Sequence, residues 1–405
     1  MMTPYSEQEV LQYMAEEDVK FIRLAFCDVF GRQKNISIMP GEVHRAFETG
    51  VAFDASSIAG FGDEQRSDLL LFPEPDTVTA LPWRPEHGRV VRMNAAVRYP
   101  DGRPFEADTR ALLKNAVLRA EKKGYSFRFG AEQEFYLFCL DENGGPTGIP
   151  CDNAGYMDIA PEDRGENVRR EVCLTLEQMG VLPESSHHEE GPGQNEIDFR
   201  YADPLKAADQ AQLFQTTVKT GAHRGGYHAD FSPKPMTGAP GNGFHINLSV
   251  AAADGSDVLP AAMAGVLAHV QEMTAFLNPT EESYRRLGRN KAPGFVSWSR
   301  QNRSQLIRIP AGEGELRRME LRSPDPGANP YLAFTLMIAA AMDGIERGLT
   351  PPPAADINLF KADSETLSRF QRLPGSLTHA KRVAGESVFL RGVLPNAVIS
   401  PYCKL

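Results

Sequence analysis

The chain has 405 residues, of which 41% are hydrophobic and 24% are charged. That composition is typical of a folded globular protein, so it excludes a disordered chain and a membrane protein, and the length predicts two or three domains. The net charge of −10, from 43 basic and 53 acidic side chains, argues against nucleic acid as the main partner and predicts a cytoplasmic protein. The five cysteines form no CxxC pair, which predicts free thiols rather than disulfides or a zinc site.

The first hundred residues predict a small sheet with one or two helices. Ser6 and Glu9 have the spacing of a capping box, which opens a short helix. Hydrophobic alternation then predicts strands over residues 19–28, 35–39, 69–72 and 90–97. The polar segment 99–104 interrupts this pattern, so we predict one domain over residues 1–102 and a second over residues 103–405.

The rest of the chain mixes helices and strands, which predicts an α+β fold. Asp108 and the pair Asp203-Pro204 are typical helix starts. The predicted helices cover residues 108–124 and 165–180, a stretch from 203, residues 258–277 and 329–347, and a last helix that begins near 363. The predicted strands cover residues 127–140, 194–201, 244–250, 307–310 and 317–322.

Carboxylates stand on strands that should be buried. In the hydrophobic strand around residues 130–138, Glu132 and Glu134 are two residues apart, so strand alternation places them on the same face. Two like charges that close repel each other, and burial costs each its hydration unless a cation lies between them. The alternative is an edge strand with one wet face.

The same pattern recurs along the chain, in Glu189, Glu196, His245 and Glu320. Together with the first strand this gives five carboxylates and one imidazole without a thiolate. Hard cations such as Mg²⁺ or Mn²⁺ prefer such ligands, and the ligand count is sufficient for two ions.

Arginines accumulate near Glu320. The set comprises Arg286, Arg303, Arg308, Arg318 and Arg322. Guanidinium groups near divalent cations suit phosphates and carboxylates, and the combination indicates phosphoryl transfer, although any one arginine could form a surface ion pair instead. The sequence has neither a GxxxxGK[ST] loop nor a GxGxxG motif, so a nucleotide would be held by metals and arginines on a sheet.

These motifs resemble the glutamine synthetase family, in particular its type I members, over about residues 21–348. The matching segments are Phe53–Ile58, Glu132–Phe135, His187–Glu189, Gly193–Glu196, Lys234-Pro235, Gly241–His245, Asn302–Ser304, Arg308–Pro310, Glu320–Pro326 and Asn329–Tyr331. The resemblance implies a small β-grasp N-terminal domain, a larger catalytic domain with a curved antiparallel sheet flanked by helices, and a homo-oligomeric ring with active sites at subunit interfaces. A shortened C-terminus leaves hexamer and dodecamer open.

The resemblance also implies a reaction and a metal set. ATP would phosphorylate the γ-carboxylate of glutamate, and ammonia, delivered as ammonium, would then displace phosphate to give glutamine. One metal ion would be held by Glu134, Glu189 and Glu196, and the other by Glu132, His245 and Glu320.

The resemblance assigns the substrates to further residues. Arg286, Arg322, Arg303 and the backbone at Gly241 would bind glutamate, with Arg303 also stabilising the transferred phosphoryl group. The ATP site would comprise Glu184, Tyr201, Asn247, Ser249, Arg303, Arg308 and Arg318. Asp54, from the N-terminal domain of a neighbouring subunit, would take a proton from ammonium.

One position departs from the family pattern. Lys291 stands where many members carry a flap glutamate that helps to bind ammonium, and a lysine should repel that cation. Another acid could complete the site, the nucleophile could differ, or the loop could rearrange. This departure motivates one alternative to an ammonia ligase, a γ-glutamyl ligase for a primary amine or polyamine. A non-catalytic assembly or regulatory protein stays open as a separate alternative.

Overall fold

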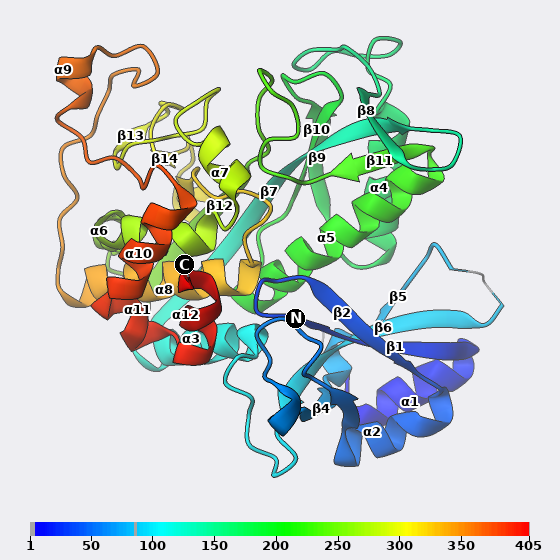
Figure 1. Ribbon diagram of the computed structural model, residues 1–405. Coiled ribbons are helices and arrows are strands. Elements are labelled where there is room, and N and C mark those ends of the chain that lie inside the picture. Colours follow the sequence, from blue (N-terminus) through cyan, green and yellow to red (C-terminus); the bar gives the residue numbers. More distant parts are fainter. Residues whose placement is uncertain (1–4, 85–86, 405) are drawn as a thin grey trace. The chain divides into compact units, whose positions relative to one another are not determined.

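The computed structural model describes residues 5–84 and 87–404 (Figure 1). The chain forms two compact units. The first comprises the residues up to Leu112 together with Leu174–Val181, and the second comprises Leu113–Cys173 and Leu182–Leu405. The domain boundary at residue 102 stays a prediction.

The first unit is built on a six-stranded sheet. Five strands follow the order β2 (Gln33–Ile38), β1 (Val19–Cys27), β6 (Arg89–Arg98), β4 (Asp68–Pro73) and β3 (Val51–Asp54), and β5 (Thr79–Ala80) pairs with β6. The β1–β6 pair is parallel and the other pairs are antiparallel. Helix α1 (Glu7–Glu16) begins with the predicted Ser6 and Glu9 capping box, and α2 (Val43–Thr49) follows β2.

The second unit contains a nine-stranded sheet. Its main order is β13 (Trp298–Arg300), β14 (Ile307–Ile309), β15 (Met319–Leu321), β12 (Phe244–Ala252), β7 (Tyr125–Leu140), β10 (Gln194–Phe199) and β9 (Pro183–His188), and β8 (Pro146–Pro150) and β11 (Tyr227–Asp230) also pair with β7. All pairs are antiparallel except β13–β14. The long strand β7 thus joins most of the sheet.

The helices complete the description. They are α3 (Thr109–Lys122), α4 (Glu166–Gln178), α5 (Pro204–Arg224), α6 (Leu259–Leu277), α7 (Glu281–Arg286), α8 (Pro330–Glu346), α9 (Ser364–Leu367), α10 (Leu377–Glu386), α11 (Val388–Val393) and α12 (Asn396–Cys403). Single turns of 3-10 helix lie at Pro40–Glu42, Glu64–Arg66, Pro75–Thr77 and Gly314–Leu316. Among the described residues, no helix is long and apolar enough to cross a membrane, and none of the five cysteines forms a disulfide bond.

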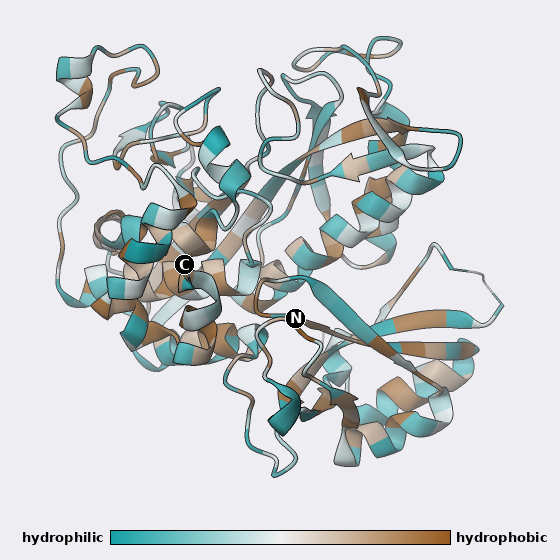
Figure 2. Ribbon diagram, viewed as in Figure 1, coloured by the Kyte–Doolittle hydropathy of each residue, from teal (hydrophilic) through white to brown (hydrophobic). Residues whose placement is uncertain are grey.

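The core of the second unit lies on one face of β7. Phe129 of that strand stacks on Phe334 of α8 with ring centroids 4.2 Å apart, and Phe135 contacts Phe214 of α5 edge-on. Figure 2 shows hydrophobic colour gathered on β7, α6 and α8, most of whose residues are buried. Since these odd-numbered residues of β7 face the helices, its even-numbered residues face the other side.

The end of the chain differs from its prediction. The helix that begins near residue 363 is α9, but it ends after one turn, and three more helices follow. The prediction of a single last helix is wrong because the pair Pro374-Gly375 and then Pro395 interrupt the helical pattern.

Candidate active site

The polar face of β7 forms the base of the candidate site. Glu132 and Glu134 both line one pocket, while Gln133 between them points to the helix side and donates to the carbonyl of Ala211 on α5. Because side chains alternate along a strand, the two carboxylates face the pocket while the residue between them faces the helices.

Strand register adds acids from the neighbouring strands. On β10, Glu196 stands opposite Glu134 and Asp198 opposite Glu132. On β12, His245 also stands opposite Glu132. Cross-strand partners share a face, so four carboxylates and an imidazole meet on the same side of the sheet. We call this group, with Glu189 from the loop after β9, the acidic face: Glu132, Glu134, Glu189, Glu196, Asp198 and His245.

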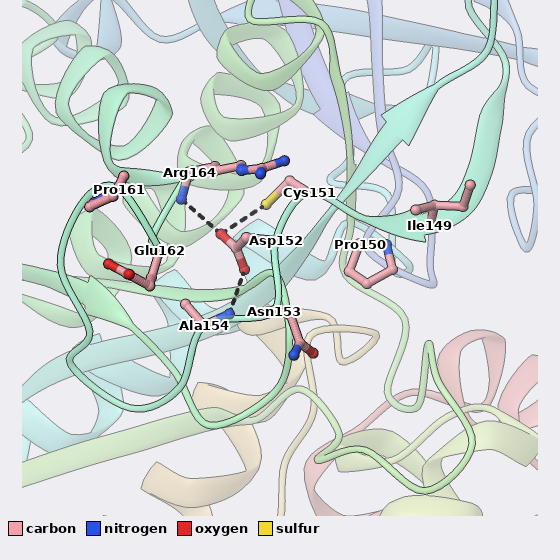
Figure 3. Close-up of a pocket in the computed structure, with 9 residues that line it drawn as sticks. All are labelled: Ile149, Pro150, Cys151, Asp152, Asn153, Ala154, Pro161, Glu162 and Arg164. Atoms are coloured by element: carbon pink, nitrogen blue, oxygen red, sulfur yellow. Dashed lines mark hydrogen bonds between the residues drawn. The ribbon is translucent and has the colours of Figure 1, made fainter.

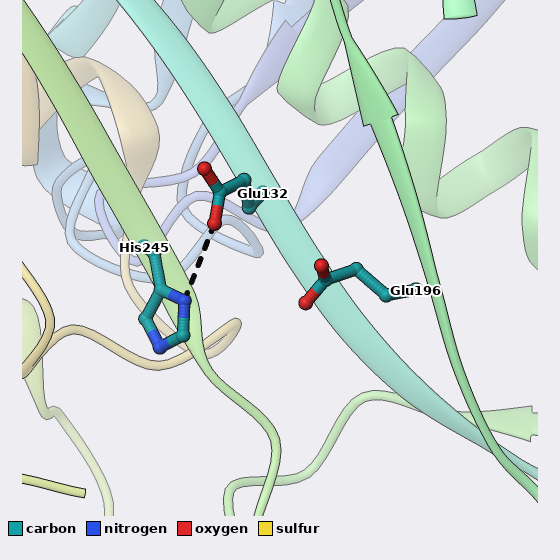
Figure 4. A group of neighbouring side chains, drawn as sticks. All are labelled: Glu132, Glu196 and His245. Atoms are coloured by element: carbon teal, nitrogen blue, oxygen red, sulfur yellow. Dashed lines mark ion pairs between the residues drawn. The ribbon is translucent and has the colours of Figure 1, made fainter. Parts of the chain in front are cut away.

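The ligand atoms of the acidic face, together with those of His187 on β9, form overlapping groups of three. In each group the atoms lie within 4.8 Å of one another: Glu132, Glu196 and His245; Glu134, Glu189 and Glu196; His187, Glu196 and Asp198. Figure 4 shows the first group, in which the carboxylate of Glu196 points towards Glu132 and His245. His245 Nδ1 lies 3.5 Å from Glu132 Oε2. Two of the groups hold most of the predicted metal ligands, whose roles stay predictions.

The acidic face carries more negative charge than the protein compensates. Burial and the neighbouring Asp198, Glu134 and Glu132 raise the pKa of Glu196 well above its usual value. Burial and the charge of Glu132 raise the pKa of Asp198 to about 6. Burial also lowers the pKa of His245 to about 3, which keeps its ring neutral, as a metal ligand must be. A divalent cation would remove this repulsion, so the residues fit Mg²⁺ or Mn²⁺.

Glu320, the remaining predicted ligand, has partners of the opposite charge. Its fully buried carboxylate pairs with Arg308, which stands opposite it on β14, and with Arg322 at 2.6 Å. His245 Nδ1 lies 3.7 Å from Glu320 Oε1. Glu320 thus lies beside the acidic face, but both of its oxygens are engaged by arginines.

Arginines form another wall of the same pocket, which has a volume of about 450 Å³. Arg286, Arg303, Arg308 and Arg322 all line it. Arg322 is buried, and its Nε has no hydrogen-bond partner among the described residues, so the guanidinium retains an unused donor. The pocket therefore offers cation ligands and anion-binding groups side by side.

Gly241 allows the main chain to pass close to its neighbours in the pocket wall. A Cβ at Gly241 would lie 2.3 Å from the carbonyl oxygen of Pro233 and 2.9 Å from Cγ of Arg286. Gly241 also accepts a hydrogen bond from Gln194 Nε2, which donates to Glu134 as well. The predicted glutamate-binding backbone is thus tied directly to the acidic face.

A smaller hollow of about 80 Å³ continues along the same face of β7 and β12. It is lined by four of the residues predicted for the ATP site, namely Tyr201, Asn247, Ser249 and Arg318, and also by Arg128, Gly130 and Leu316. Asn247 Nδ2 donates to Glu132 Oε1 at 2.7 Å and so connects the hollow to the acidic face. Glu184 lines neither cavity; it lies on β9 and is 3.9 Å from Arg200.

Lys291, the residue that differs from the family pattern, has a partner at the mouth of the pocket. Lys291 Nζ forms an ion pair with Glu190, the residue after Glu189. Asn290 and Lys291 both have positive φ, at +45° and +67°, a conformation that is unusual for residues with side chains. Glu190 thus supplies an acid beside the lysine, which the sequence pattern did not assign.

Several other pocket residues were not predicted: Tyr156, Met157, Ser185, His187, Glu190, Gln194 and Asp198. Asp198 could have been found, because it stands two residues after Glu196 on the same strand and the alternation used for Glu132 and Glu134 applies equally. Asp54, in contrast, lies in the first unit at the end of β3. It is exposed, and hydrogen bonds from the hydroxyl and backbone of Ser56 lower the pKa of its carboxyl.

Comparison with known families gives matches over most of the chain. Residues 18–100 match the glutamine synthetase β-grasp domain, and residues 106–405 match the glutamine synthetase catalytic domain. These matches confirm the predicted α+β class and its β-grasp N-terminal part.

Individual proteins are similar over nearly full length. A glutamine synthetase of Methanosarcina mazei is 44% identical over 98% of this chain and 92% of its own, and one of Clostridium saccharobutylicum is 41% identical over 99% and 94%. Among solved structures, GmaS in complex with ADP is 29% identical with a TM-score of 0.88, covering 98% of this chain and 94% of its own. GmaS without ligand is 30% identical with a TM-score of 0.87, covering 97% and 93%.

Proposed function

Because this chain belongs to the glutamine synthetase family, we propose that it is an ATP-dependent ligase that joins ammonia to the γ-carboxylate of L-glutamate. The observation that carries the proposal is the acidic face, where uncompensated carboxylates share one pocket with four arginines. A reaction that brings a triphosphate and a carboxylate together needs this combination, because the reactants repel each other.

The first half of the reaction activates glutamate. A γ-carboxylate oxygen attacks the terminal phosphorus of ATP, the bond to ADP breaks, and γ-glutamyl phosphate forms. Arg286, Arg322 and the backbone at Gly241 would hold glutamate, and Arg303 would stabilise the transferred group. Mg²⁺ or Mn²⁺ bound by Glu132, Glu134, Glu189, Glu196, His245 and Glu320 would supply neutralisation of the phosphate charge.

The second half forms the amide. Ammonia attacks the activated acyl carbon, the carbon–oxygen bond to phosphate breaks, and glutamine and phosphate leave. Asp54 would take the proton from ammonium if a neighbouring subunit places it at the site, and we therefore also propose a homo-oligomeric ring, hexameric or dodecameric. Light scattering on the protein as it elutes from a sizing column measures the mass of the assembly. A fully active monomer would contradict an active site that is shared between subunits.

The test of the proposed function is phosphate release from ATP. We expect release to require both glutamate and ammonium, with glutamine as the product. If ammonium adds nothing to the rate with glutamate alone, the proposal is wrong. A protein that neither releases phosphate nor gains thermal stability from Mn²⁺ with ATP would instead be a non-catalytic assembly or regulatory member.

A second candidate is a γ-glutamyl ligase for a primary amine or polyamine. The ion pair of Lys291 with Glu190 at the pocket mouth favours it, because a lysine replaces a source of attraction for ammonium. The similarity to GmaS is compatible with it. Turnover with ammonium, methylamine and putrescine, compared between wild type, Lys291→Glu and the neutral Lys291→Gln, distinguishes the candidates. An ammonia ligase prefers ammonium in all three proteins. Its KM for ammonium should fall in Lys291→Gln, which removes the repulsion, and fall further in Lys291→Glu, which adds attraction.

A further inference from the structure

A second charged cluster lies on the opposite face of the strands that carry the acidic face. We call it the rear network: Asp152, Asp163, Arg169, His188 and Asn195. His188 and Asn195 are direct neighbours of Glu189 and Glu196 in sequence and stand opposite each other on β9 and β10. Strand alternation turns them away from the pocket, and all five side chains are buried.

Asp152 is the centre of one half of the network. Its Oδ1 accepts hydrogen bonds from His188 Nε2 and the backbone of Gly193, both at 2.9 Å. Its Oδ2 accepts from the backbone of Arg164 at 2.9 Å, beside a hollow that Asp152 lines together with Cys151 and Glu162 (Figure 3). The carboxylate is therefore fully satisfied within the protein.

His188 links Asp152 to the main chain of the acidic face. Its Nδ1 lies 2.6 Å from the carbonyl oxygen of Glu189. Since a carboxylate oxygen and a carbonyl oxygen both only accept, both ring nitrogens of His188 donate. The ring thus connects Asp152 to the main chain of Glu189.

Arg169 fixes the other strand. Its guanidinium pairs with Asp163 at 2.5 Å and 3.1 Å and also donates to Asn195 Oδ1 at 2.5 Å. Asn195 Nδ2 in turn donates to the carbonyl of Gly193. Gly193 has a φ of +70°, and a Cβ there would lie 2.8 Å from the carbonyl oxygen of Leu137, so the turn between Glu189 and Glu196 is held at both ends.

We propose that the rear network positions Glu189 and Glu196 for cation binding, and that Asp152, His188 and Arg169 are positioning residues of the metal site. The inference rests on the proposed function, because it assumes that the acidic face binds divalent cations. Carboxylates that repel one another would turn apart unless their main chain were fixed, and hydrogen bonds from the other side of the strands fix it without adding charge to the pocket.

The test is Mn²⁺ binding by the full-length protein, measured by electron paramagnetic resonance of the free ion. For Asp152→Asn we expect affinity to fall about 10- to 100-fold. Activity should fall at limiting Mn²⁺ and return towards the wild-type kcat at saturating Mn²⁺. A role in stability alone would not produce this rescue by metal.

The matched control is Asp343→Asn. His269 Nε2 of α6 and Asp343 of α8 form a pair with the same separation of 2.9 Å, and neither lines the pocket. This variant should melt at a lower temperature but bind Mn²⁺ as wild type does.

Each outcome has one meaning. If Asp152→Asn binds Mn²⁺ with wild-type affinity, the inference is wrong. If Asp152→Asn does not fold, Arg169→Lys replaces it, because lysine keeps the charge but cannot reach both Asp163 and Asn195; unchanged affinity in that variant is equally decisive. If wild type itself binds no Mn²⁺, the proposed function fails rather than the positioning role.

Discussion

The acidic face and the rear network contain the same kinds of ligand atoms in equally tight groups. Asp152, Asp163 and His188 place theirs within 4.8 Å of one another, as Glu132, Glu196 and His245 do. The groups differ in their surroundings, because the guanidinium of Arg169 and several backbone amides already contact the carboxylates of the rear network. Proximity of ligand atoms therefore does not make a cation site; uncompensated negative charge does.

The pKa values express this difference. Burial and neighbouring carboxylates raise the pKa of Glu196. Burial alone would also raise the pKa of Asp152, but hydrogen bonds from His188 and from the backbone of Arg164 and Gly193 outweigh it and lower that pKa. In the acidic face the neighbouring negative charges raise the pKa values, whereas the carboxylates of the rear network have Arg169 and His188 as partners.

The largest change in stability should follow from breaking the rear network. Arg169→Met leaves the carboxylate of Asp163, which is 2% exposed, buried without its partner. We expect the free energy of unfolding to fall by about 3–5 kcal/mol, measured by urea denaturation without metal. A loss comparable to that of an exposed ion pair such as Arg369 with Glu365 would show that the network is not compensated as described.

The acidic face should be more important for turnover than for folding. Glu196→Gln removes the carboxylate that all three groups of pocket ligands share. We expect phosphate release to fall about 10²- to 10³-fold, the range for losing one group that stabilises transition-state charge. The exposed Glu365→Gln serves as control, and near-wild-type activity of Glu196→Gln would contradict the assignment of the acidic face.

Two isosteric substitutions should move stability in opposite directions. At neutral pH without metal, Asp198→Asn removes a repelled carboxylate and should raise the free energy of unfolding by about 1 kcal/mol. Asp163→Asn removes the partner of Arg169 and should lower it. If both variants are destabilised, the acidic face is not strained by its own charge.

Stabilisation by Mn²⁺ should increase with pH. The pKa of Asp198 is about 6 in the folded protein and 3.8 without its surroundings, so between these values the folded state binds more protons than the unfolded state. Metal-free stability from this group therefore falls as the pH rises through that range, and protons compete with Mn²⁺ at the acid end. The rise in melting temperature on adding Mn²⁺ should be larger at about pH 7.5 than at about pH 5.5. The same rise at both values would exclude this competition.

The smallest effect on stability should come from the pocket mouth. Lys291 and Glu190 are half exposed, so Lys291→Ala should change the free energy of unfolding by less than about 1 kcal/mol. Chemical denaturation measures this difference. A larger loss would mean that the pair holds the loop in place and does not merely tune the charge at the entrance.

Local pattern was sufficient to predict much of the acidic face. Alternation alone places Glu132 and Glu134 on one face, and the structure bears out that arrangement, since both line the pocket. Strands made mostly of polar residues were harder to predict. Strand β9 reads Pro-Glu-Ser-Ser-His-His and carries no hydrophobic alternation. Its identity as a strand comes from pairing with β10, which is a tertiary interaction.

The rear network could not be predicted, because its contacts join residues far apart in sequence. His188 meets Asp152 across 36 positions and Asn195 meets Arg169 across 26. No periodicity marks such pairs. Likewise Lys291 meets Glu190 across 101 positions, so its counter-ion became visible only in the fold.

Glu196 belongs to every one of the three pocket groups, so two ions that each occupied one of these groups would share a single carboxylate. Loading one ion would then alter the free energy of loading the next, and a titration with Mn²⁺ would resolve into unequal steps. Occupancy would then act as a graded control on turnover, sensitive to the divalent-ion concentration around the protein.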